Sequence, residues 1–141
     1  MYRMVKVNPS NYHHQRILWR QSPKNPLQDY QMSVLMFGEK PAPWLATRTV
    51  QELARLEKEN FPLASQIMQQ DLYVDDLISG SSSPEEVKEL RCQVQAMMQA
   101  GGFLMRKWVC PVESVMTSIP EKLRGSFNLI PISNDASVKT L

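Results

Sequence analysis

The spacing of hydrophobic residues changes along the chain from a strand-like to a helix-like pattern. Residues 12–20 and 29–37 are rich in β-branched and aromatic residues, and a proline-rich connection over residues 21–28 separates them. This pattern predicts two strands in a hairpin. From residue 43 to about residue 60 the spacing predicts a helix, because the residues expected on its buried face recur every three or four positions. They are Leu45, Ala46, Thr49, Val50, Leu53 and Leu56. A hairpin followed by a long amphipathic helix is therefore expected.

A second long helix is predicted over residues 83–100. Ser83 and Glu86 have the spacing of a capping box, and Pro84 suits the first helical position. The expected apolar stripe consists of Val87, Leu90, Val94, Met97 and Met98. Gly101-Gly102 then ends the helix, because glycine readily adopts the left-handed conformation found at helix ends.

The segments around these two helices are shorter. A helical piece is predicted over residues 63–70, a hairpin over residues 71–80 with Asp75 and Asp76 at its tip, and a strand over residues 103–109. A helical turn is expected near residues 112–119, and no element is predicted beyond Pro120. Residues 2–7 fit either the end of a strand or a short helical turn. The mixture predicts an α+β fold.

Composition narrows the class of protein. The 141 residues suit one domain, and 43% hydrophobic against 21% charged residues favours a folded globular chain. The net charge of +2 neither requires nor excludes a nucleic-acid partner. The longest apolar run, residues 34–37, is far too short to span a membrane, so an intracellular, cytoplasmic protein with no membrane partner is expected. Cys92 and Cys110 are expected to be reduced thiols.

The adjacent acids Asp75 and Asp76 carry the clearest chemistry. Two neighbouring carboxylates at a rigid hairpin tip hold divalent ions well, and Mg²⁺ takes few protein carboxylates while keeping water and phosphate oxygens in its other positions. The alternative is an ordinary turn on a solvated loop, where aspartate is also common. His13 and His14 are adjacent on a predicted strand, where neighbours point to opposite faces, so a shared metal site is not expected there.

Tyr73-Val74-Asp75-Asp76 resembles the Tyr-x-Asp-Asp box of reverse transcriptases, and it lies between two amphipathic helices as that box does. Three further segments are similar to the same family: residues 1–7, residues 37–46 and residues 101–108. Within the family, the likeness is greatest to the Pao/BEL-type long-terminal-repeat retrotransposons. The segments that suggest this subgroup are residues 16–20, 61–64 and 138–141.

The resemblance implies a partial polymerase palm, in which an antiparallel sheet with a Tyr-x-Asp-Asp hairpin carries two long helices on one face. Residues 1–120 would form this palm, truncated at its N-terminus, and residues 121–141 an irregular lead-in to a primer-contacting hairpin. The family's first catalytic aspartate would stand just upstream of Met1. The chain alone is therefore expected to be inactive and weakly stable.

The activity implied by the resemblance is RNA-directed DNA synthesis with two Mg²⁺ ions. Its partners would be an RNA or DNA template with a primer, and deoxynucleotide triphosphates. Asp75 would be the main metal ligand from this hairpin and Asp76 a supporting one.

Four further residues would contact the nucleotide in such an enzyme. Tyr2 would pack beneath the sugar and disfavour a 2′-hydroxyl, Phe37 and Gly38 would line the nucleotide, and Lys107 would lie near the leaving phosphates. A core tyrosine, an ordinary loop and a solvated lysine are the alternatives. The basic residues Arg16, Arg20 and Lys24 are expected either to touch template phosphates or to form a plain exposed face.

Two other functions compete with the polymerase interpretation. One is a non-catalytic, transposon-derived remnant with at most weak nucleic-acid binding. The other is an unrelated two-carboxylate phosphohydrolase, which is disfavoured because the sequence offers no suitably placed histidine or further acidic cluster.

Overall fold

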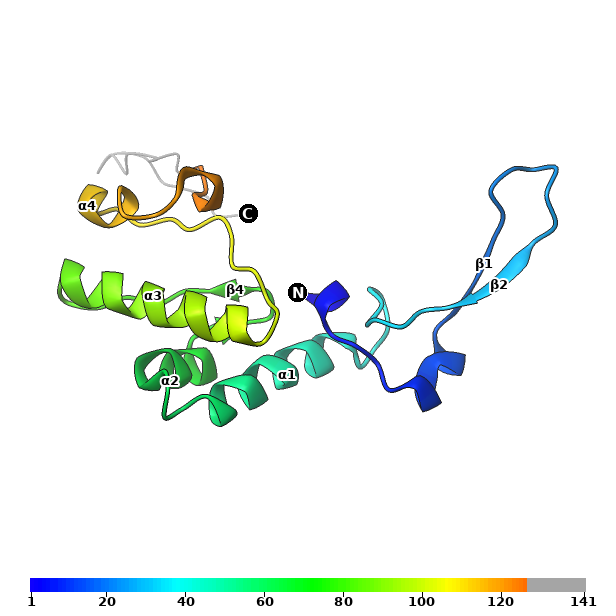
Figure 1. Ribbon diagram of the computed structural model, residues 1–141, viewed down its shortest axis with the longest axis horizontal. Helices are drawn as coiled ribbons and strands as arrows, with labels where there is room; N and C mark the ends of the chain where they lie inside the picture. The colour runs from blue at the N-terminus through cyan, green and yellow to red at the C-terminus, as the bar shows by residue number, and fades with distance from the viewer. Residues whose placement is uncertain (127–141) are drawn as a thin grey trace, which may run out of the picture. The chain divides into compact units, whose positions relative to one another are not determined.

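Pairs of short strands are interspersed among helices along residues 1–126, the part of the chain that the structure describes (Figure 1). This computed structural model divides the chain into two units, Met1–Met105 and Arg106–Leu141. Helices and two small antiparallel sheets occur together, so the predicted α+β class is confirmed. No helix within residues 1–126 has the length and apolarity needed to cross a membrane.

Three helices form the core of the first unit. They are α1 (Ala42–Leu56), α2 (Pro62–Gln70) and α3 (Pro84–Ala100). Helix α2 packs against both α1 and α3 (Figure 1). The fully buried side chains at their contacts include Ala46, Val50, Ala64, Met68, Val94 and Met97. Removing this apolar surface from water is the main term that stabilises the unit.

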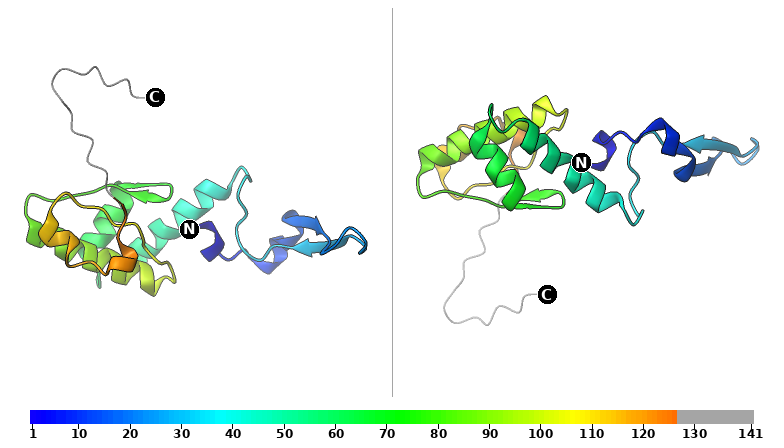
Figure 2. Two further views of the ribbon diagram at one scale, coloured as in Figure 1. Left: turned by 90° about the horizontal axis from the view of Figure 1, so that it is seen from above. Right: turned by 90° about the horizontal axis from the view of Figure 1, so that it is seen from below.

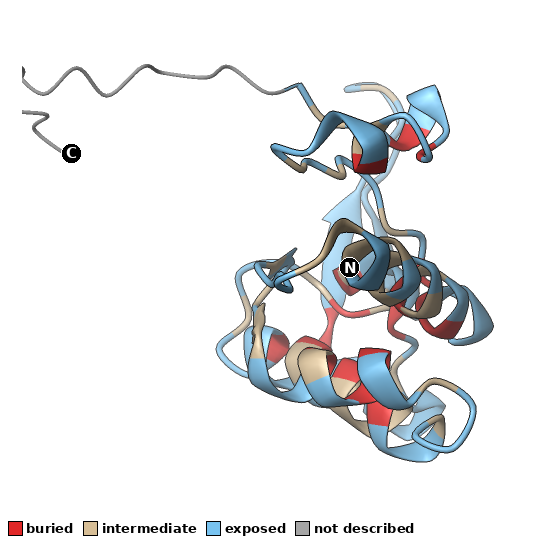
Figure 3. Cartoon of the chain, turned by 90° about the vertical axis from the view of Figure 1, so that its left-hand side faces the viewer, coloured by how far each residue is buried: buried red, intermediate tan, exposed pale blue. Residues whose placement is uncertain are grey.

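The buried face of α1 differs from the predicted stripe. Ala42, Ala46, Val50 and Ala54, each four residues apart, are buried, whereas Leu56 is 64% exposed. Leu45 is also exposed. Small residues at the contact let helix backbones approach closely, which leaves the larger leucines outside the contact. Figure 3 shows such buried positions, in red, recurring along the helices.

Both ends of α3 lie where predicted, but only one of the two hydrogen bonds of the predicted capping box forms, because the Glu86 side chain accepts from the Ser81 hydroxyl instead of the Ser83 N–H. The Ser83 hydroxyl accepts a hydrogen bond from the Glu86 N–H at 3.2 Å, and Pro84 begins the helix. At the other end Gly102 has φ +79°, the Phe103 N–H donates to the Met98 carbonyl, and the Gly102 N–H donates to the Gln99 carbonyl. These two bonds form a Schellman motif, which satisfies carbonyls that the helix itself leaves unpaired.

The N-terminal hairpin is shorter than predicted. Its strands are β1 (Arg16–Trp19) and β2 (Gln28–Gln31), antiparallel with Arg16 opposite Gln31 (Figure 2). Residues 12–15, predicted as strand, instead lie in and just after the 3₁₀ helix η2 (Pro9–His14), which the Asn8 side chain caps. In this helix the rings of His13 and His14 have centroids 3.8 Å apart, so the expected opposite orientation is wrong.

Several hydrogen bonds join the N-terminal segment to the segment that follows β2. Residues 2–4 form the 3₁₀ helix η1 (Tyr2–Met4), and Lys6 then makes an isolated bridge with Val34. The buried Gln15 side chain accepts a hydrogen bond from the Met36 N–H at 3.0 Å. The segment leaving β2 is therefore held beside the N-terminal segment.

The second hairpin consists of β3 (Leu72–Tyr73) and β4 (Asp76–Leu77). Within residues 1–126 it forms a sheet of its own, separate from β1 and β2. The single antiparallel sheet expected beneath two helices is therefore not present in the described part of the chain. Strands of two to four residues bury too little surface to hold a wider sheet together.

The second unit, described over residues 106–126, contains α4 (Glu113–Met116) and the 3₁₀ helix η3 (Glu121–Leu123). The predicted turn at residues 112–119 is thus confirmed. The predicted strand at residues 103–109 is wrong: only Trp108 pairs, in an isolated bridge with Arg124, because Lys107 has φ +59° and interrupts the extended backbone. Most of the predicted lead-in at residues 121–141, including residues 138–141, lies outside the described residues.

Candidate functional site

The β3–β4 hairpin places its acidic residues at a two-residue turn. Tyr73 pairs with Asp76 and Leu72 with Leu77, so Val74 and Asp75 form the turn. Asp75 lies at the tip, whereas Asp76 is the first residue of β4. Both side chains are exposed. The expectation that both acids stand at the tip therefore applies to Asp75 alone.

Val74 has an unusual backbone conformation. Its φ is +51°, in the left-handed region that glycine occupies readily and β-branched residues rarely adopt. A positive φ at the first position of a two-residue hairpin turn is a geometry in which glycine normally stands. The turn that carries Asp75 is thus strained, and strained backbone is frequent at functional sites.

The carboxylates of Asp75 and Asp76 accept no hydrogen bond and form no ion pair with any residue in 1–126. Their oxygens are therefore free to bind a cation. Hard divalent cations such as Mg²⁺ prefer carboxylate oxygens of this kind. No group of three or more His, Cys, Asp or Glu side chains converges on one point among the described residues.

The residues expected at the nucleotide include one contacting pair. The rings of Tyr2 and Phe37 have centroids 4.7 Å apart and are inclined by 37°. Tyr2 is buried, whereas Phe37 is 62% exposed. The next residue, Gly38, has φ +89°, and a side chain at that position would meet no atom within 4 Å. Its backbone angle, rather than crowding by neighbours in this structure, is what requires glycine there.

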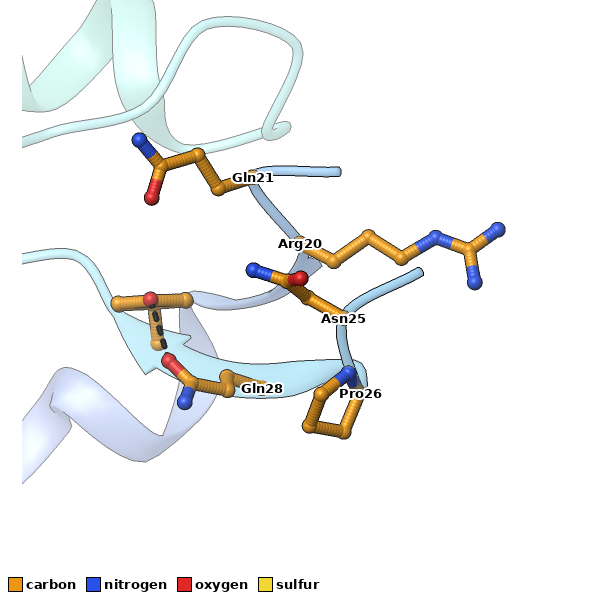
Figure 4. Close-up of a pocket in the computed structure, with 6 residues that line it drawn as sticks. Arg20, Gln21, Asn25, Pro26 and Gln28 are labelled. Atoms are coloured by element: carbon orange, nitrogen blue, oxygen red, sulfur yellow. Dashed lines mark hydrogen bonds between the residues drawn. The ribbon is translucent and has the colours of Figure 1, made fainter. Parts of the chain in front are cut away.

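The basic residues of the first hairpin separate into two groups. Arg16 is held by Asp29, with its Nε donating to Oδ1 at 3.1 Å and a second contact from its terminal nitrogen. Arg20 and Lys24 lie exposed in the loop that follows β1. Beside this loop is a small hollow of about 160 Å³, lined by Arg20, Gln21, Asn25, Pro26, Gln28 and Tyr30 (Figure 4).

Lys107 belongs to the second unit, where it is exposed. The structure thus brings Tyr2 to Phe37 and places Asp75 in the turn directly before Asp76 in β4, while Arg16 is paired with Asp29. Three features escaped the sequence analysis: the strained Val74, and the exposed rings of Trp19 and Tyr30 on the first hairpin. Comparison with known proteins finds no matching family, no matching curated protein and no matching solved structure.

Proposed function

We propose that this chain is part of the palm of an RNA-directed DNA polymerase, with Asp75 and Asp76 as metal-binding carboxylates. The observation that carries the proposal is the exposed hairpin turn on which two consecutive carboxylates without partners follow a strained Val74. The resemblance of the surrounding segments to reverse transcriptases supports the same function.

The strain at Val74 is relevant to metal binding. A non-glycine residue at positive φ costs about 1–3 kcal/mol, and such a conformation persists only where its surroundings fix it. A valine in this turn also has fewer accessible backbone conformations than glycine. The carboxylate of Asp75 is therefore attached to a backbone of restricted freedom, as a preorganised metal ligand requires.

The donor set fits magnesium. Asp75 is the main ligand in this proposal, and Asp76 supports it from the first position of β4. When bound, the two Mg²⁺ ions stabilise negative charge on the attacking primer oxygen and on the leaving pyrophosphate. The chain's own part is to present carboxylate oxygens that are free of competing protein donors in the described part of the chain.

Other residues position the nucleotide and the template in this proposal. Tyr2 packs beneath the sugar and disfavours a 2′-hydroxyl, and its contact with Phe37 restrains the ring. Phe37 and Gly38 line the nucleotide. Arg20 and Lys24 contact template phosphates, whereas the charge of Arg16 is already balanced by Asp29.

The experiment is a primer-extension assay on a fusion. The full chain is joined to an upstream segment that carries the first palm aspartate and the fingers, and to a thumb. We expect Mg²⁺-dependent incorporation of deoxynucleotides on an RNA template, and we expect Asp75→Asn to abolish it because the amide keeps the shape but removes the charge that holds the ions.

Glu85→Gln is the matched control, since Glu85 is an exposed acid in the first turn of α3. It should leave incorporation unchanged. Full incorporation by Asp75→Asn would contradict the proposal. A fusion that binds the primed template without extending it would favour the non-catalytic remnant instead.

A further inference from the structure

The β1–β2 hairpin exposes aromatic rings on one of its faces. Every residue of both strands is exposed, including Trp19 at 60%. Trp19 lies opposite Gln28 and Ile17 opposite Tyr30. Opposite residues share a face of a sheet, as do residues two apart along a strand. Trp19 and Tyr30 therefore lie diagonally across the same exposed face.

Two positively charged side chains lie in the loop that joins the strands of this hairpin. Arg20 and Lys24 are exposed there and form no ion pair with any residue in 1–126. The only acid between residues 16 and 31 is Asp29. It pairs with Arg16 and lies opposite Leu18, on the other face of the hairpin. The aromatic face is therefore bordered by cations without a balancing acid.

The hollow in Figure 4 adds hydrogen-bonding groups beside the Tyr30 ring. Three of its lining side chains are amides, from Gln21, Asn25 and Gln28. The Tyr30 hydroxyl donates to the Gln28 side-chain oxygen at 2.7 Å, which restrains the ring. Amide groups both donate and accept hydrogen bonds, as the edges of nucleic-acid bases require.

We propose that this hairpin face binds single-stranded nucleic acid, with bases stacked on Trp19 and Tyr30 and phosphates contacted by Arg20 and Lys24. Exposed aromatic rings beside unpaired cations are the features by which proteins hold single strands. The positive charges of Arg20 and Lys24 argue against an apolar protein surface as the occupant, because such a surface offers no negative charge to balance them. Because Arg20 and Lys24 also contact the template in the proposed function, this inference rests on that proposal in part and adds the aromatic contacts. No residue of the Asp75 turn takes part, so the hairpin assignment and the metal-site assignment can fail separately.

The test is fluorescence anisotropy of labelled oligo(rU) and oligo(dT) with the full chain. Trp19→Ala should weaken binding by at least about fivefold, because stacking on one aromatic side chain contributes that much or more. Tyr30→Ala should weaken it similarly, whereas Tyr30→Phe keeps the ring and should keep the affinity. Trp44→Ala is the matched control: Trp44 lies on α1 and is 66% exposed.

A second measurement examines the cations. Arg20→Gln combined with Lys24→Gln should reduce the slope of log K against log salt concentration by about 1.4, the value for two phosphate contacts on a single strand. Circular dichroism of each variant checks that the fold is retained, which exposed substitutions should not disturb.

Several outcomes would overturn the hairpin assignment. One is the absence of saturable binding by the wild-type chain, and another is equal affinity of Trp19→Ala and Trp44→Ala. A change in sedimentation on Trp19→Ala, without a change in affinity, would show that the face contacts protein. The double variant Asp75→Asn, Asp76→Asn should bind the oligonucleotides normally. If this variant does not bind them, the nucleic acid binds at the Asp75 turn instead.

Discussion

Val74 is a β-branched residue at a backbone angle that glycine adopts without strain. Val74→Gly should therefore raise the free energy of unfolding by about 1 kcal/mol, the size of the left-handed penalty for a side chain. Urea melts measure this change. Val112→Gly is the control, because Val112 has an ordinary φ of −91° and gains nothing from glycine. A Val74→Gly variant less stable than wild type would show that the angle carries no strain.

Single residues were predicted unevenly from the sequence. The exposed acids Asp75 and Asp76 were recognisable because residue type and flanking pattern suffice for a solvated turn. The angle of Val74 was not, since valine is among the residues least expected there. The pairing of Arg16 with Asp29 depends on strand register, which places Leu18 rather than Arg16 directly opposite Asp29. Sequence spacing alone does not determine that register.

At the scale of elements, the contacts between helices determine which substitutions lower the free energy of unfolding most. Met68 on α2 is fully buried, whereas Leu56 at the end of α1 is 64% exposed. Met68→Ala should lower the free energy of unfolding by about 2–5 kcal/mol, and Leu56→Ala by less than about 0.5 kcal/mol. Urea melts of both variants give the comparison. Equal losses of unfolding free energy in the two variants would show that Leu56 is buried, as the stripe predicted from helical spacing requires.

The exposed side of α1 carries a charge cluster that responds to pH. The hydrogen bond from Arg55, aided by the attraction of Arg55 and Arg48, lowers the pKa of Glu52 below its ordinary value of 4.5. A lowered folded-state pKa stabilises the fold above the unfolded value, and this contribution is lost as pH falls through the folded value.

Glu52→Gln should therefore lower the melting temperature slightly at pH 7, and this effect should disappear as the pH falls through the lowered folded-state pKa of Glu52. Thermal melts at a series of pH values measure the difference. In an Arg55→Gln background the effect of Glu52→Gln should shrink, because the main partner is gone. A destabilisation by Glu52→Gln that does not diminish with falling pH would mean that its charge is not the cause.

For the whole molecule, the fold class and both long helices were predictable, while the sheet was not. Helical spacing marks both α1 and α3, and capping residues also mark the ends of α3. The strands β1 and β2 are exposed on both faces, so they lack the alternation of apolar and polar residues that marks the length of a strand. The strands predicted from β-propensity alone were therefore too long.

The central claim is that the Asp75–Asp76 turn binds a divalent cation, and paramagnetic broadening of amide NMR signals by Mn²⁺ tests it on the full chain. Mn²⁺ binds the same oxygen ligands as Mg²⁺. Signals of residues 73–78 should broaden first, and the double variant Asp75→Asn, Asp76→Asn should remove this effect. The control Glu59→Gln, Glu85→Gln removes the same charge from exposed positions and should not. Broadening that spreads equally over the exposed acids, or survives in the aspartate variant, would contradict the claim.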